Sequence, residues 1–337
     1  SRVSRGLGDV YKRQRFTIEF QQALWPLSPM TTPDLAAIHK ARETIAGIAI
    51  KTPLVPSPFL SARIGSEVLL KLDMMQPMGA FKLRGAANAL MNLPKDINGV
   101  TCCSTGNHGR GVAYAAKKLG LRAVICMSEL VPQTKVDGIR ALGAEVRIVG
   151  RSQDDAQREV ERLVDQEGLQ DVSPFDDPDV IAGQGTIGLE LMEDRPDLET
   201  LIIPLSGGGL AGGIAIAAKA VNPDIRIIGV TMENGAAMYH SIRAGQPVDV
   251  IEVGSLADSL GGGIMANNRY TLDLCSHLID ETLLVSETEI YSAMQTLFFE
   301  DRLVSEGSAA TTIAALLSGR ISPVSYTHLR AHETHEN

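Results

Sequence analysis

The sequence predicts an α/β fold in which parallel strands alternate with helices. From Met30 onward, short runs rich in Val, Ile and Leu alternate with helix-like segments of about 10–15 residues. Hydrophobic residues make up 44% of the chain but aromatic residues only 4%, which is typical of parallel sheets covered by helices. The 32 glycines are clustered, which indicates loops where backbone approaches a ligand. The 337 residues suffice for two domains and a large core.

The elements follow from the spacing of apolar residues. The predicted strands are aliphatic and cover 68–72, 99–103, 122–127, 145–149, 200–205 and 225–231. The predicted helices have apolar residues at helical spacing and cover 82–92, 107–119, 134–142, 153–166, 181–192, 210–221, 287–302 and 308–317. Before them, Thr31-Thr32-Pro33-Asp34 supplies an N-cap and a first-turn proline for a helix ending near Ala46. In such folds ligands bind beyond the carboxyl ends of strands, so the loops that follow strands are the first candidates for a site.

Both ends of the chain lack a periodicity that leads into the fold. Residues 1–14 and 322–337 resemble translated sequencing-adapter or vector sequence. We therefore expect a non-native or read-through leader over 1–29 and a non-native tail over 322–337. The tail carries three of the seven histidines, which we do not interpret as a metal site.

Composition excludes several classes of function. The formal charge is −9 and the central chain has no dense Lys/Arg run, so nucleic acid is not an expected partner. Cys102, Cys103, Cys126 and Cys275 form no CxxC pair, which indicates buried thiols in a reducing compartment. No apolar stretch reaches about 18 residues, so no membrane span is expected. We find no secretion signal after setting the ends aside, which favours the cytoplasm.

Lys82 is the first candidate functional residue. It follows Gly79, Ala80 and Phe81 and begins a predicted helix. A lysine held among apolar groups loses its proton more readily, and the resulting amine suits a Schiff base with an aldehyde cofactor. The alternative is a helix-start lysine that reaches solvent, and taken alone this alternative is the more common. Two further loops reverse that judgement.

The second loop, Ser104-Thr105-Gly106-Asn107-His108, follows the strand predicted over 99–103. Hydroxyl groups and the free N–H groups at a helix start bind anions such as carboxylate or phosphate. The alternative is an ordinary N-cap made by Ser104 or Thr105. We expect His108 to be a packing or supporting residue rather than a catalytic base.

The third loop, Ser206-Gly207-Gly208-Gly209-Leu210, follows the strand predicted over 200–205. Its glycines let successive N–H groups converge on one phosphate. It lacks the Gly-Lys-Ser/Thr of a P-loop, and no GxGxxG with an acidic residue about 20 positions later favours a dinucleotide. Together the three loops offer an amine, a phosphate nest and a carboxylate cradle, which an enzyme using pyridoxal 5′-phosphate on an amino acid requires.

The motifs GAFKLRGA, STGNHGRGVAYAAKKLG and SGGGLAGG, in this order, resemble the threonine/serine dehydratases among the fold-type II pyridoxal-phosphate enzymes. The resemblance covers residues 52–317. It implies two open, mainly parallel twisted sheets with helices on both faces, as in tryptophan synthase β, and a cofactor between two domains. The large domain would take 30–98 and 169–321, and the small domain 99–168. The wording STGNHGR and LADSLGGGI is most similar to the dehydratase of hydroxyectoine utilisation.

The resemblance also assigns roles. Lys82 would form the Schiff base, Phe81 would lie near the ring, and Asn107 would bind the phenolic oxygen. The phosphate would be held by the N–H groups of Gly207, Gly208, Gly209 and Leu210, and the substrate carboxylate would be framed by Ser104, Thr105, Gly106 and His108. The segment 257–260 would wall the ring.

The implied reaction is β-elimination of water from a hydroxy amino acid such as L-threonine or L-serine, which gives a 2-oxo acid and ammonia. Alternatives are a hydroxyectoine-derived substrate, a serine or threonine racemase in which Thr105 is the second acid/base, and a catalytically dead ligand-binding relative. A nicotinamide dehydrogenase is least favoured, because the ribose-binding acid is missing. The family habit predicts a homo-oligomer that acts on a small-molecule amino acid.

Two departures from the family pattern matter. Carboxylate ligands of a divalent cation in relatives align with Thr231 and Ala237, and a backbone ligand aligns with Gly235. Hard cations prefer charged oxygens, so we expect no metal site, although Glu233 lies close by in sequence. The family's hydroxyl partner for the pyridine nitrogen is not found after Ile321, which predicts weaker cofactor binding by this chain than by a full-length relative.

Overall fold

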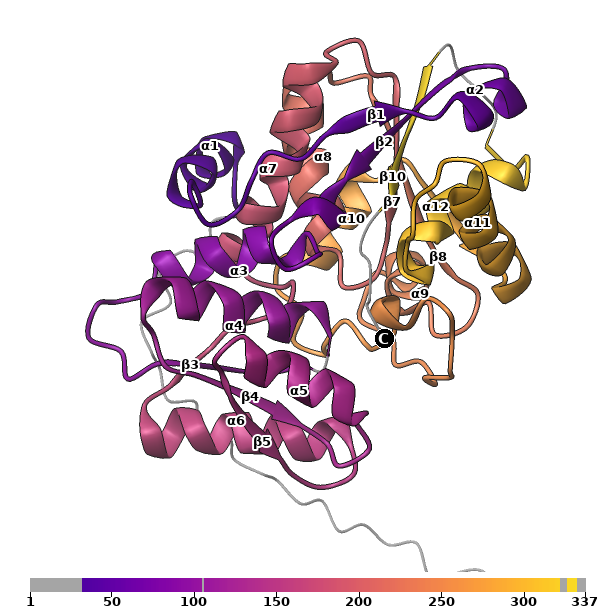
Figure 1. The fold of residues 1–337 in the computed structure, drawn as a ribbon. Coiled ribbons are helices and arrows are strands. Elements are labelled where there is room, and N and C mark those ends of the chain that lie inside the picture. The colour runs from indigo at the N-terminus through magenta and orange to yellow at the C-terminus, as the bar shows by residue number, and fades with distance from the viewer. Residues whose placement is uncertain (1–31, 105, 322–325, 332–337) are drawn as a thin grey trace, which may run out of the picture. The chain divides into compact units, whose positions relative to one another are not determined.

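Two sheets organise the molecule in the computed structural model, which describes residues 32–104 and 106–321 and the backbone of 326–331 (Figure 1). The larger sheet has the strand order β1-β2-β10-β7-β8-β9 and the smaller β5-β4-β3-β6. The strands are β1 (Leu54–Pro56), β2 (Glu67–Leu72), β3 (Val100–Cys103), β4 (Ala123–Met127), β5 (Glu145–Ile148), β6 (Gln170–Asp171), β7 (Thr200–Pro204), β8 (Arg226–Met232), β9 (Glu281–Val285) and β10 (Tyr326–Ala331). Neighbouring strands are parallel except β1 and β2, which are antiparallel.

Helices alternate with these strands along the chain. They are α1 (Leu35–Thr44), α2 (Pro58–Ile64), α3 (Lys82–Met91), α4 (Asn107–Leu119), α5 (Gln133–Ala141), α6 (Gln153–Glu167), α7 (Pro178–Asp194), α8 (Gly209–Val221), α9 (Ala237–Ala244), α10 (Thr271–Leu278), α11 (Glu287–Phe299) and α12 (Gly307–Leu317), with short 3-10 turns η1 (Asp73–Met75) and η2 (Asp258–Leu260). No helix in the described ranges is long and apolar enough to cross a membrane.

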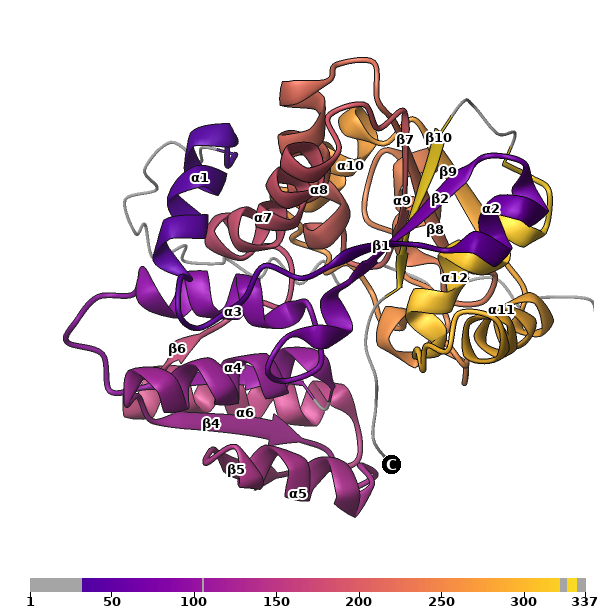
Figure 2. The ribbon, with the colours of Figure 1, turned by 45° about the horizontal axis from the view of Figure 1, so that its top comes forward.

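Helices cover both faces of the larger sheet (Figures 1 and 2). Successive strand side chains point to opposite faces, and β7 follows this rule. Ile202 packs in the core formed with α11 and α12, whereas Leu201 and Ile203 pack in the core formed with α7 and α8. In the smaller sheet, Ile125 of β4 faces α4 and α5, and Cys126 faces α6. The predicted fold of two mainly parallel sheets is confirmed.

Most predicted elements are found with small shifts at their ends, and three boundaries differ. Asp34 caps α1 by accepting a hydrogen bond from the Ala37 N–H at 2.8 Å, so the expectation of a proline in the first turn is wrong, because Pro33 precedes the cap. α7 begins at Pro178, earlier than predicted, because Asp177 caps it. α11 ends at Phe299 rather than 302, and Arg302 has a φ of 59°.

The ends set aside in the sequence analysis lie mostly outside the described residues. The backbone of β10 is the exception, and it pairs in parallel with β2 on one side and β7 on the other. Whether residues 322–337 are foreign to the natural protein stays a prediction.

Candidate active site

Lys82 lies at the start of α3, next to the first turns of α4. Its Nζ donates a hydrogen bond to the Pro174 carbonyl at 2.6 Å and lies 5.4 Å from the centre of the Phe81 ring. A side chain at Gly111 of α4 would place its Cβ 3.3 Å from the Lys82 carbonyl, so glycine allows the two helices to pack closely here. Both Phe81 and Lys82 are half-buried.

The glycine loop follows β7 and opens α8. Gly208 precedes the helix with a φ of 87°, a left-handed conformation that favours glycine. Because Gly208 has no side chain, it makes no capping hydrogen bond to the N–H groups in the first turn of α8. Leu210 is buried and packs into the core under the sheet. The loop therefore presents the start of a helix suited to an anion.

The loop after β3 brings two predicted residues into buried positions. Asn107, the first residue of α4, donates from Nδ2 to Glu306 Oε2 at 3.2 Å, and Ser259 Oγ donates to the same oxygen at 3.2 Å. Gly106 precedes the helix, and its N–H donates to Ser104 Oγ at 3.3 Å. Thr105 lies outside the described residues.

His108 is 4% exposed, and its Nε2 donates to the Val172 carbonyl at 2.7 Å. Burial, and secondarily the charge of Lys82, lower the pKa of His108 to about 3. The ring is therefore neutral at pH 7, and its Nδ1 is a buried acceptor without a partner among the described residues. A pKa this low makes His108 a weak base, and its role as a packing or supporting residue stays a prediction.

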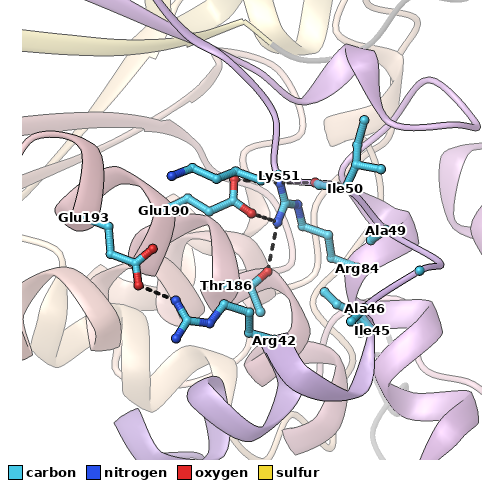
Figure 3. A pocket seen from close by; sticks show the side chains of 11 residues that line it. Arg42, Ile45, Ala46, Ala49, Ile50, Lys51, Arg84, Thr186, Glu190 and Glu193 are labelled. Atoms are coloured by element: carbon cyan, nitrogen blue, oxygen red, sulfur yellow. Dashed lines mark hydrogen bonds and ion pairs between the residues drawn. The ribbon is translucent and has the colours of Figure 1, made fainter.

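A charged cluster fixes α3 two residues beyond Lys82. The buried Arg84 guanidinium donates from Nε and Nη2 to Asp73, both at 2.9 Å. It also donates to Glu190 and Thr186, as Figure 3 shows. Lys71 Nζ lies 2.6 Å from Glu190 Oε2. Burial lowers the pKa of Lys71, and Glu190 opposes that shift. Two cations and two anions thus balance inside the protein.

A cavity of about 300 Å³ adjoins this cluster (Figure 3). It is lined by charged side chains and by the segment after α1, namely Arg42, Ile45, Ala46, Gly47, Ala49, Ile50, Lys51, Arg84, Thr186, Glu190 and Glu193. Arg42 pairs with Glu193, and Lys51 with Asp194. Arg84 is the one lining residue that belongs to the GAFKLRGA motif, and neither Lys82, nor the loop after β3, nor the glycine loop lines this cavity.

Sequence reasoning missed the segment that joins Lys82 to the glycine loop. Residues 173–177 connect β6 to α7; Pro174 accepts the Lys82 hydrogen bond, and Phe175 packs against the glycine loop. The stretch has no periodicity, and only Asp177 before Pro178 signalled a helix start. Glu306 was also missed, because nothing in the sequence links it to Asn107, 199 residues earlier.

The residues brought together fit the predicted cofactor. Lys82 supplies an amine, the start of α8 an anion site, and Asn107 and the unpartnered His108 Nδ1 buried polar groups near the start of α4. Among the residues that the structure describes, no three His, Cys, Asp or Glu side chains are grouped to hold a metal ion.

Comparisons with known proteins agree with this chemistry. A family model described as "Pyridoxal-phosphate dependent enzyme" matches residues 45–325. A Sinorhizobium fredii protein whose name proposes a threonine dehydratase is 53% identical over 88% of this chain and 90% of its own length. The catabolic L-threonine dehydratase of Escherichia coli K12 is 40% identical over 84% of this chain and 86% of its own.

Solved structures agree as well. Maize serine racemase superposes with a TM-score of 0.86 at 30% identity, covering 90% of this chain and 94% of that one. The processed form of a threonine deaminase from Solanum lycopersicum gives a TM-score of 0.82 at 34% identity, covering 91% of this chain and 92% of that one.

Proposed function

Because the chain belongs to the family of pyridoxal-phosphate dependent enzymes, we propose that it is a dehydratase that converts a hydroxy amino acid, such as L-threonine or L-serine, to a 2-oxo acid and ammonia. The names of its relatives support this reaction. The observation that carries the proposal is that one short segment, residues 173–177, contacts both Lys82 and the glycine loop. An amine and an anion site are thereby held side by side.

In this proposal the aldehyde, the phenolic oxygen, the phosphate and the ring of the cofactor each have a partner. Lys82 would bind the aldehyde, Asn107 the phenolic oxygen, and the N–H groups from Gly207 to Leu210 the phosphate, with Phe81 near the ring. When bound, the ring supplies an electron sink for the pair left on the substrate α-carbon.

The chain's own residues then position the substrate and move its proton. The substrate carboxylate would lie against Ser104, Gly106 and the start of α4, where helix N–H groups favour an anion. Lys82 Nζ would take the α-proton, and the Pro174 carbonyl fixes the direction of that nitrogen at 2.6 Å. A neutral His108 would offer Nδ1 as an acceptor without adding positive charge.

Replacing the lysine tests the proposal. We expect Lys82→Ala to lower 2-oxo acid release from L-threonine by about 10²–10⁴-fold or more, the range for loss of a positioned base. The visible absorption of the protein with pyridoxal 5′-phosphate should also lose its response to L-threonine. Lys95→Ala, at an exposed lysine, is the matched control. Unchanged turnover in Lys82→Ala would refute the assignment.

Racemisation of serine is a second candidate, favoured by the similarity to maize serine racemase. A racemase needs an acid/base group on each face of the ring, and Thr105 offers a hydroxyl at the loop after β3. Thr105→Ala should abolish formation of D-serine, measured by chiral chromatography, and spare elimination. Parallel loss of both reactions would count against this role.

We propose further that the substrate is a free amino acid and that the chain acts as a homo-oligomer in the cytoplasm. The family resemblance supports the substrate class and the assembly, and the location in the cytoplasm stays a prediction from the sequence. A hydroxyectoine-derived substrate remains a prediction from motif wording. Light scattering after size-exclusion chromatography tests the assembly, and a single-chain mass would refute it.

A further inference from the structure

Phe175 packs directly on the glycine loop. A Cβ at Gly207 would lie 2.3 Å from Cγ and Cδ1 of the Phe175 ring. A Cβ at Gly209 would lie 2.7 Å from the Phe175 carbonyl oxygen and 3.0 Å from its Cα. The space beside both glycines is therefore filled by one residue, and contacts this short admit no side chain at either position.

The residues on each side of Phe175 are tied to other parts of the site. Pro174 accepts the hydrogen bond from Lys82 Nζ. The Asp176 carboxylate accepts hydrogen bonds from the N–H groups of Arg269, Tyr270 and Thr271 at 2.7, 2.9 and 2.9 Å. Three backbone donors on one carboxylate hold the start of α10 in place.

α10 supports the same loop from a second direction. A Cβ at Gly208 would lie 2.8 Å from Cys275 Sγ and 3.0 Å from Thr271 Cβ, both on α10. Cys275 Sγ also contacts the Gly208 carbonyl at 3.6 Å. Met238 Cε of α9 would lie 2.7 Å from a Cβ at Gly208, so the three glycines are enclosed by Phe175, by the helix that Asp176 anchors and by Met238.

We propose that Phe175 is the positioning residue of the phosphate site: its ring holds the glycine loop with its N–H groups directed at one anion, in a fixed relation to Lys82. This inference rests on the proposed function of the loop. It also explains the glycines differently from the sequence analysis. Gly207 is required because Phe175 occupies its side-chain space, and only secondarily because a ligand approaches.

Paired ligands measure the effect at the phosphate alone. Dissociation constants for pyridoxal 5′-phosphate and for pyridoxal, which lacks the phosphate, are determined by equilibrium dialysis. We expect Phe175→Ala to weaken pyridoxal 5′-phosphate by about 10- to 100-fold, the scale for binding groups misplaced by about an ångström. Pyridoxal affinity should change less than about twofold, since it does not depend on the loop. Phe298→Ala, at a phenylalanine that is 52% exposed on α11, is the matched control.

A double variant, Gly207→Ala with Phe175→Ala, tests whether Gly207 is required by the Phe175 ring or by the ligand. Gly207→Ala alone should weaken pyridoxal 5′-phosphate strongly, because its Cβ overlaps the Phe175 ring. Adding Phe175→Ala makes room for the methyl group, so the double variant should bind more tightly than Gly207→Ala. This comparison holds even if Phe175→Ala alone is poorly folded, because recovery of binding in the double variant requires a folded site.

The outcomes are distinct. The inference is overturned if Phe175→Ala prefers pyridoxal 5′-phosphate over pyridoxal by the same factor as the unaltered protein. It is also overturned if the double variant binds pyridoxal 5′-phosphate no more tightly than Gly207→Ala. Either result leaves the proposed function intact. Equal affinity of the unaltered protein for both ligands overturns the phosphate role of the loop and the inference with it.

Discussion

Replacing Arg84 by methionine should destabilise the protein far more than a similar change at its surface. Arg84 is 1% exposed, and it neutralises Asp73 and Glu190, which are 0% and 4% exposed. Without it, Lys71 is the remaining cation of the cluster, and Asp73 loses two hydrogen bonds of 2.9 Å. Breaking a buried ion pair by removing one partner costs about 3–5 kcal/mol. We expect a loss of that size for Arg84→Met.

Arg42→Met is the control. Arg42 pairs with Glu193, but the two side chains are 41% and 48% exposed, so the expected loss is about 0–1 kcal/mol. Urea unfolding followed by circular dichroism gives both values from the midpoints and slopes. If the two variants lose the same stability, the charges of the inner cluster do not support α3 as argued.

Two further predictions concern the loop after β3. The pKa of His108 is about 3 in the folded protein and about 6.5 when unfolded, so the unfolded chain binds more protons between these values and stability should fall as the pH drops through this window. His108→Gln, which keeps a donor for the Val172 carbonyl, should flatten that fall in urea midpoints measured from pH 7 to 4, and an unchanged slope would contradict the reasoning. Glu306→Gln should weaken pyridoxal 5′-phosphate by about 3- to 10-fold. An amide can accept from or donate to Asn107, so it no longer fixes the orientation of the Asn107 side chain, and one hydrogen bond contributes about 0.5–1.5 kcal/mol. Glu287→Gln is the control, since Glu287 accepts from Ser255 Oγ at 2.6 Å in the adjacent segment, and equal losses in both variants would exclude a specific role for Glu306.

The sequence predicted what depends on local pattern. The helix Asn107–Leu119 has the bounds expected from its apolar spacing, and the strands of both sheets are aliphatic enough to identify. Short or partly exposed elements such as β6 and β9 were not predicted, because two to five residues carry little periodicity.

The site shows where local pattern fails. The glycine loop was recognised from its composition, but the residue that fills the space beside it was not. Phe175 contacts Gly207 because the chain leaves the smaller sheet after β6 and passes the glycine loop. Pro174 accepts a hydrogen bond from Lys82, which lies 92 positions earlier. Such contacts depend on how the elements pack, and no residue type at these positions signals its distant partner.

The strand order has a consequence for how the protein is made. The smaller sheet uses a contiguous stretch of chain, from β3 to β6, whereas the larger sheet takes β2 from before it and β7 from after it. About 130 residues separate the end of β2 at Leu72 from the start of β7 at Thr200, a delay of roughly 6–25 s at about 5–20 residues per second of synthesis. The smaller sheet, whose strands all precede residue 172, can form on the ribosome during that delay. Lys82 is therefore synthesised long before the glycine loop, and the site is completed only when the larger sheet forms.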